Sequence, residues 1–184
     1  MNMCAMHLAI LRQFCGVTYL VVYASQIPIH TQTSLGSAGF VVENSIQMIG
    51  GMIGIPMVMN LSRYKMVAVS TVLLLFLNLS IGMGSLFEIS QLAFASICVF
   101  MFICGSTLTS VTWTYPAELA TPGLEKWGSV VSMGGTAIVT IVPPFVTGAM
   151  PNGEAYPIFF FFALYLGIAA ILNDYLLPRD KPSN

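Results

Sequence analysis

Six runs of about twenty apolar residues decide what this chain can fold into. A helix of roughly 20 apolar residues crosses a hydrocarbon core about 30 Å thick. Charged residues are 7% of the 184 residues and hydrophobic residues 57%, whereas a soluble domain carries about a quarter charged residues. We therefore predict an all-α membrane protein, a single domain over residues 1–184 with six transmembrane helices. The predicted spans are residues 4–27, 38–59, 66–86, 92–115, 128–150 and 156–177.

The basic residues outside these spans predict the orientation of the chain. Arg63, Lys65, Lys126, Arg179 and Lys181 all follow the second, fourth or sixth span, and the loops on the opposite side contain no Lys or Arg. Because Lys and Arg accumulate in cytoplasmic loops, we expect both termini to be cytoplasmic. We expect an integral, multi-pass protein of the plasma membrane.

The chemically reactive residues do not form the constellations that enzymes or metal sites need. Cys4, Cys15, Cys98 and Cys104 fall inside predicted spans without CxxC spacing, which favours buried thiols over disulfides or zinc ligands. The pattern contains no Ser/His/Asp set and no phosphate-binding loop. We predict no enzymatic activity, no cofactor and no metal, and the net charge of −1 gives no indication of nucleic-acid binding.

Polar side chains inside the first, second and fourth spans are the most informative residues, because each is costly in lipid and usually faces the bundle interior. Gln13 and Thr18 share a broad face of the first span, and Glu43 and Gln47 stack on one face of the second. The fourth span adds a run of Ser and Thr that ends at Trp113. Together these residues indicate a solvated cavity. For any single Ser or Thr, the alternative is a hydrogen bond that ties helices together.

Arg12 lies near the middle of the first span, where a guanidinium costs several kcal/mol. Three interpretations stay open at this point. Arg12 binds an anionic or hydroxyl-rich substrate, it pairs with Glu43, or the span starts later and Arg12 reaches the cytoplasmic interface.

Glycines at helical spacing predict where helices approach one another closely. Small residues let helix backbones come together in membranes, and we favour this interpretation over a role in substrate binding. The pairs are Gly50 with Gly54, Gly82 with Gly84, and Gly134 with Gly135.

Four short motifs stand in a distinctive order: RQFCGVTYLVVY (12–23), LSRYK (61–65), WTYPAEL (113–119) and LPRDKP (177–182). They resemble motifs of sugar porters of the major facilitator superfamily. The counterparts are the seventh-helix QQxSGxNAxxYY motif, the basic loop between helices eight and nine, the tenth-helix Trp with its YPAE run, and the PETKG-like sequence after the last helix. The resemblance covers nearly the whole chain. It implies the C-terminal six-helix half of a 12-helix fold.

The resemblance also implies a set of substrate contacts. Gln13 matches the second Gln of the seventh-helix motif, and its amide can donate to and accept from a sugar hydroxyl. Thr18 stands at the Asn of the GxN element, and Gln47 where the eighth helix supplies an Asn. Trp113 matches the Trp that packs against the sugar ring. Arg12 replaces the first Gln of the motif, so we expect the selectivity for hexoses to differ from that of the family.

Two gate residues follow from the same resemblance. Tyr23 matches the second aromatic residue of the extracellular gate, and Glu118 matches the Glu of the intracellular gate. Val22 replaces the first gate Tyr. The arginines that normally follow the YPAE run are missing, with Gly123 and Glu125 at their approximate places.

The function implied by the resemblance is transport of a small polyhydroxylated solute, a sugar such as a hexose, by alternating access between two six-helix halves. The chain matches one half only. It therefore needs a partner in the lipid bilayer, either an N-terminal six-helix half or a second copy. The alternative is a non-transporting membrane sensor or assembly protein, or a degenerate transporter fragment.

Overall fold

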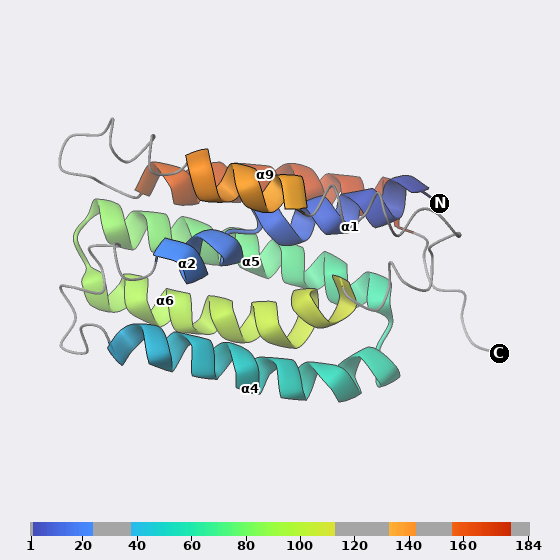
Figure 1. Ribbon diagram of the computed structural model, residues 1–184, viewed down its shortest axis with the longest axis horizontal. Helices are drawn as coiled ribbons and strands as arrows, with labels where there is room; N and C mark the ends of the chain where they lie inside the picture. The colour runs from blue at the N-terminus through green and yellow to red at the C-terminus, as the bar shows by residue number, and fades with distance from the viewer. Residues whose placement is uncertain (1, 24–37, 113–132, 143–155, 178–184) are drawn as a thin grey trace.

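The computed structural model describes residues 2–23, 38–112, 133–142 and 156–177, which form helices that lie side by side along one direction (Figure 1). Within these residues there is no strand. This confirms an all-α fold. The elements are α1 (Asn2–Phe14), α2 (Val17–Tyr23), α4 (Ala38–Asn60), α5 (Arg63–Leu86), α6 (Ser90–Ile103), the π-helical segment η2 (Cys104–Thr109), a helix over Met133–Val142 and α9 (Tyr156–Leu176).

Five stretches of the described residues are long and apolar enough to cross a membrane, and they correspond to five of the predicted spans. Of the remaining predicted span, residues 128–150, the structure describes only the short apolar helix Met133–Val142. The five stretches are Met6–Tyr23, Ala38–Asn60, Arg63–Leu86, Ser90–Thr112 and Tyr156–Leu176.

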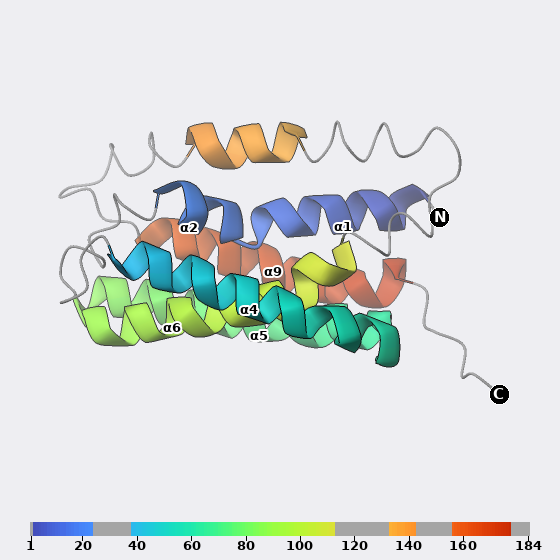
Figure 2. The ribbon, with the colours of Figure 1, turned by 60° about the horizontal axis from the view of Figure 1, so that its bottom comes forward.

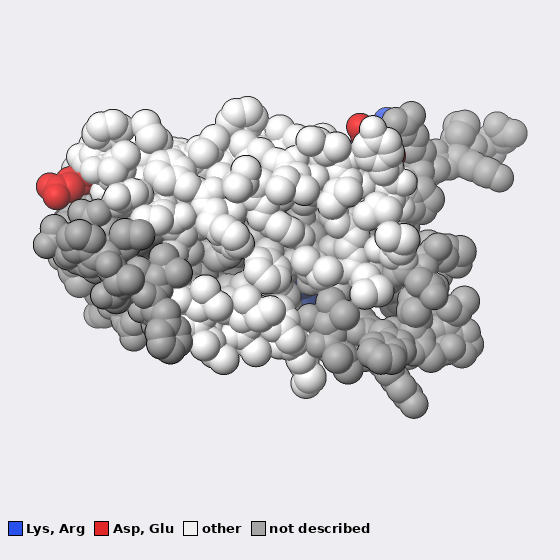
Figure 3. Space-filling model, turned by 90° about the horizontal axis from the view of Figure 1, so that it is seen from above, with Lys and Arg blue, Asp and Glu red and all other residues white. Residues whose placement is uncertain are grey.

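The surface of this bundle is apolar between its two ends. Helix α5 packs against both α6 and α9, while α4 packs against α6 and η2. Large apolar side chains such as Ile55, Phe76 and Leu164 are more than 60% exposed on the outside. In Figure 3 the charged residues gather at the two ends, and the face between them is almost entirely uncharged. Such a surface fits hydrocarbon as its solvent.

Short turns make consecutive helices antiparallel neighbours. Ser62 precedes α5 and its hydroxyl accepts a bond of 3.4 Å from the Lys65 backbone N–H, which caps the helix. At the other end of α5, Glu88 has a φ of +57°, and the Ile89 N–H donates to the Gly84 carbonyl at 2.8 Å. This pairing ends the helix in a Schellman-type turn. It places Glu88 and the basic residues of the Ser62 turn at opposite ends of α5.

The first span is not one continuous helix. We expected a single transmembrane helix over residues 4–27, but α1 ends at Phe14 and α2 begins at Val17. The two lie end to end in both ribbon views (Figures 1 and 2). Gly16 between them has a φ of +103°, a backbone conformation that a residue with a Cβ adopts only at a cost. A Cβ at this position would also lie 3.2 Å from Asn78 Oδ1.

Asn78 of α5 stabilises this break. Its side chain is fully buried, and Nδ2 donates to the Cys15 carbonyl at 3.2 Å and to the Leu74 carbonyl at 2.8 Å. A backbone carbonyl that leaves a helix inside a bilayer needs a donor from the protein itself. The sequence pattern assigned no structural role to Asn78. The contact with Cys15 spans 63 residues of sequence.

Close packing through glycine joins α4 to α6 and η2, as the glycine spacing predicted. A Cβ on Gly50 would lie 2.6 Å from the Phe102 carbonyl oxygen, and one on Gly54 would collide with the Ser106 carbonyl. From the other side, a Cβ on Gly105 would collide with the Gln47 carbonyl. The two helices therefore meet backbone to backbone, with no room for a side chain between them.

Replacing Asn78 with Leu should destabilise the protein by about 1–3 kcal/mol, because the Cys15 carbonyl loses a buried hydrogen-bond donor. The measurement is unfolding by denaturing detergent in micelles. Asn60→Leu is the matched control, since the exposed Asn60 amide donates to the Pro56 carbonyl of its own helix at 2.9 Å. This substitution should change stability by less than about 0.5 kcal/mol. Equal losses in the two variants would show that Asn78 does not hold the break.

Replacing Gly54 with Ala should cost about 1–3 kcal/mol, because the added methyl group overpacks the contact between α4 and η2. Gly51→Ala is the control on the same helix, since no atom lies within 4 Å of a Cβ built there. This control should be neutral or slightly stabilising, because Ala favours a helix over Gly by about 1 kcal/mol. Thermal unfolding in detergent distinguishes the two, and a stable Gly54→Ala variant would contradict the tight contact.

Candidate functional site

The break between α1 and α2 brings two of the predicted substrate residues together. Gln13 lies in the last turn of α1 and is 6% exposed. Thr18 lies in the first turn of α2, and its hydroxyl donates to Gln13 Oε1 at 3.0 Å. This bond crosses the break. The sequence predicted that Gln13 and Thr18 share a broad face of one helix, whereas in the structure they lie on two helix ends and contact each other directly. An amide and a hydroxyl side by side can both donate to and accept from a polyhydroxylated solute.

The helix Met133–Val142 lies alongside α1 and α2 (Figure 2). It approaches α1 at Gly135, where a Cβ would lie 3.1 Å from Cβ and Cγ of Gln13. At the far end of α2 the Tyr23 hydroxyl donates to the Thr140 carbonyl. Tyr23 also packs against Tyr19, with ring centroids 5.3 Å apart. The predicted gate residue Tyr23 therefore joins α2 to the fifth predicted span.

Arg12 sits immediately before Gln13 and is half-buried. It lies inside the candidate span Met6–Tyr23. Its backbone carbonyl accepts a bond of 3.1 Å from the Cys15 thiol. The thiols of Cys15 and Cys104 are in mutual contact and are electrostatic neighbours of the guanidinium. Arg12 thus lies where the break meets η2.

Gln47 and Glu43 occupy α4, which packs directly against η2. The Gln47 side chain is half-buried, and its backbone carbonyl lies against Gly105 of η2. The Glu43 side chain is fully buried, with Cys98 of α6 as an electrostatic neighbour. The segment η2 therefore contacts both α4 and the break at Cys15. The remaining predicted residues, Trp113 and Glu118, lie outside the described residues.

The hydroxyl groups at the π-helical end of the fourth span bond within their own helix, whereas Ser96 of α6 bonds to Ser80 of α5 at 2.8 Å. Thr107 donates to the Ile103 carbonyl at 2.6 Å and Ser110 to the Gly105 carbonyl at 3.1 Å. The Ser80–Ser96 bond ties two helices together, as the alternative for a single Ser predicted, whereas the hydroxyls around η2 bond to carbonyls of their own helix. Such bonds to preceding carbonyls bend helices, and here they accompany the π-helical turn, a distortion frequent at functional sites. The solvated cavity stays a prediction.

A buried polar network positions α1 from its other end, and sequence reasoning missed it. His7 Nε2 lies 2.8 Å from Asn173 Oδ1, and Asn173 Nδ2 donates to Thr71 Oγ1 at 3.1 Å. The network joins α1, α9 and α5, and all three side chains are buried. The available signal was the presence of amide and imidazole groups in apolar runs, which lipid penalises unless they are paired. In the described part of the chain, no three His, Cys, Asp or Glu residues could hold a metal ion together.

The comparisons with known proteins identify a family for the chain. No curated protein matches the chain. A family profile described as "Sugar (and other) transporter" matches residues 2–177, a range that includes every predicted site residue and all of the described helices. On this match the chain belongs to the sugar transporter family, as a multi-pass membrane protein with half of a major facilitator fold.

Proposed function

We propose that the chain moves a small polyhydroxylated solute, a hexose in the first instance, across a membrane by alternating access. Arg12, Gln13, Thr18, Gln47 and Trp113 bind the solute, while Tyr23 and Glu118 serve the gates. The observation that carries this proposal is the Thr18–Gln13 hydrogen bond across the break in the first span.

A broken transmembrane helix supports solute binding on physical grounds. Transporter sites commonly lie at discontinuous helices, where helix ends and unwound backbone present polar groups near the middle of the bilayer. The α1–α2 break offers such a place, and Gly16 allows the chain to turn there. The neutral Gln13 and Thr18 can exchange their mutual bond for bonds to hydroxyls of a sugar, at little net cost.

A partner half completes the site in this proposal. In alternating access the solute lies between two six-helix units that rock against each other. Arg12, Thr18 and Gln47 are all half-buried in the single half described here, and polar groups left against hydrocarbon are costly. An N-terminal six-helix half therefore covers them, or a second copy of the chain does so.

The orientation that we propose places both termini in the cytoplasm of a plasma-membrane protein. Arg63 and Lys65 mark one end of α5, and Glu88 lies just beyond the other. Basic residues favour the cytoplasmic side. The α4–α5 turn is then cytoplasmic, and the α5–α6 turn faces the opposite side.

Radiolabelled hexose uptake in transport-deficient cells tests the solute site, with the chain expressed alone and together with a family N-terminal half. Gln13→Ala and Thr18→Val should each raise the KM about two- to tenfold, because each removes hydrogen bonds worth about 0.5–1.5 kcal/mol. Trp113→Ala should reduce uptake as well. Ser45→Ala is the control, since that exposed hydroxyl bonds the Val41 carbonyl of its own helix at 2.7 Å.

The outcome against the proposal is equally specific. A chain that inserts into the membrane but shows no uptake, alone or with the partner half, is a sensor, an assembly protein or a degenerate transporter. Uptake that is unaffected by Gln13→Ala and Thr18→Val would show that the chain transports the solute but does not bind it at the α1–α2 break.

Labelling with a membrane-impermeant thiol reagent tests the orientation. Phe87→Cys, at a position 62% exposed in the α5–α6 turn, should react in intact cells. Lys65→Cys, at an exposed position of the first turn of α5, should react only after permeabilisation. The unsubstituted chain measures the background from the native thiols. The reverse pattern would invert the proposed topology.

A further inference from the structure

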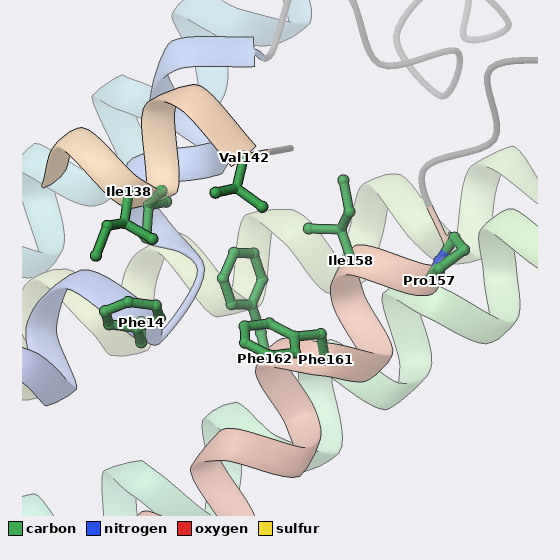
Figure 4. A pocket seen from close by; sticks show the side chains of 8 residues that line it. Phe14, Ile138, Val142, Pro157, Ile158, Phe161 and Phe162 are labelled. Carbon is green, nitrogen blue, oxygen red and sulfur yellow. The ribbon is translucent and has the colours of Figure 1, made fainter. Parts of the chain in front are cut away.

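An apolar cavity of about 280 Å³ lies between α9, the helix Met133–Val142 and the end of α1. Figure 4 shows Ile138 and Val142 pointing across it toward Phe14, Phe161 and Phe162. Its wall is made almost entirely of carbon. The complete lining is Phe14, Ile138, Val139, Val142, Pro157, Ile158, Phe161 and Phe162.

The exposure of the lining residues shows that the cavity has a closed floor and an open rim. Val139 and Phe162 are at most 3% exposed and form the floor. Ile138, Val142 and Phe161 are about half exposed, at 51%, 48% and 54%. They belong both to the cavity and to the apolar outer surface, so the cavity opens on the side where the bundle meets hydrocarbon.

The position of the cavity along α9 gives it a direction. Its lining begins at Pro157, the second residue of α9, and continues to Phe162. At 1.5 Å per residue this is about 7.5 Å of helix. The first turn of a transmembrane helix lies near the membrane border, and the deeper end reaches Phe14 beside the break in the first span. The cavity therefore leads from the border toward the middle of the bilayer.

We propose that this cavity binds one acyl chain of a membrane phospholipid, with the headgroup held outside near the start of α9. A cavity lined only by apolar side chains stays dry, and one of about 150 Å³ holds a molecule as large as benzene. The larger volume here accommodates a segment of a flexible chain. An acyl chain reaches this site from hydrocarbon rather than from water, so the gain comes from closer packing and binding is selective rather than tight. This site does not depend on the proposed sugar transport.

The test uses the full chain in nanodiscs of phosphatidylcholine that carries a photoactivatable diazirine at the end of one acyl chain. After illumination, peptide mass spectrometry locates the adducts. We expect adducts on Ile158, Phe161 and Phe162 at least five times as often as on Ile171, which is on the same helix, 63% exposed and outside the cavity.

Val139→Phe fills the floor of the cavity and should reduce these adducts to the level of Ile171. Ile171→Phe is the matched control and should leave them unchanged. If Val139→Phe does not fold, Val142→Trp narrows the mouth at a half-exposed position, and the same loss is expected. In delipidated protein, added phospholipid should raise the melting temperature of the unsubstituted chain but not of the filled variant, because only a ligand that binds the folded state stabilises it.

Two results would overturn the proposal. Equal labelling of the lining residues and Ile171, unchanged by Val139→Phe, would show contact with bulk lipid only. Loss of the lining adducts when an N-terminal half is co-reconstituted would show that this face is an interface between the two halves. Hexose uptake is measured separately, so neither result decides whether the chain transports a solute.

Discussion

The need to satisfy each backbone carbonyl inside a bilayer shapes most of this structure. Water is absent there, so a helix can end within the membrane only where the protein supplies a donor. Asn78 supplies one to Cys15 at the end of α1, and the Tyr23 hydroxyl supplies one to Thr140. The hydroxyls of Thr107 and Ser110 do so around the π-helical turn. The irregular points of the helices are therefore the points where polar side chains gather.

A second constraint is that lipid gives helices little hydrophobic reason to associate. Close van der Waals packing must replace it, and small residues make this possible. Gly50 and Gly54 bring α4 against the backbone of α6 and η2. The α1–α2 pair instead meets its neighbours through side chains such as Asn78, Gln13 and Tyr23. The bundle thus combines a backbone-packed pair of helices with a broken helix held by polar contacts, and the candidate solute site lies at the broken helix.

Several features of the fold were predictable because each depends on residues close together in sequence. Apolar runs predicted the spans, and Gly50 and Gly54 predicted a close helix contact, because both follow from helical geometry and membrane thickness. The resemblance of RQFCGVTYLVVY to a seventh-helix motif predicted the family, and the spacing of Gln13 and Thr18 placed both on one broad face of the first span. The break at Gly16 was not predictable in this way, since a single Gly is also tolerated inside a helix. Its conformation depends on Asn78, 63 residues from Cys15.

By itself the sequence determined that the chain is an all-α membrane protein of the sugar transporter family, because twenty-residue apolar runs and local motifs need no knowledge of neighbours in space. Only the tertiary structure decided where the first span breaks, which hydroxyls bond to their own helix, and that His7 meets Asn173. It also decided that α9, the end of α1 and the helix Met133–Val142 line an apolar cavity. These features arise from contacts between distant segments, and their geometry follows from how the helices pack rather than from the spacing of residues within any one of them.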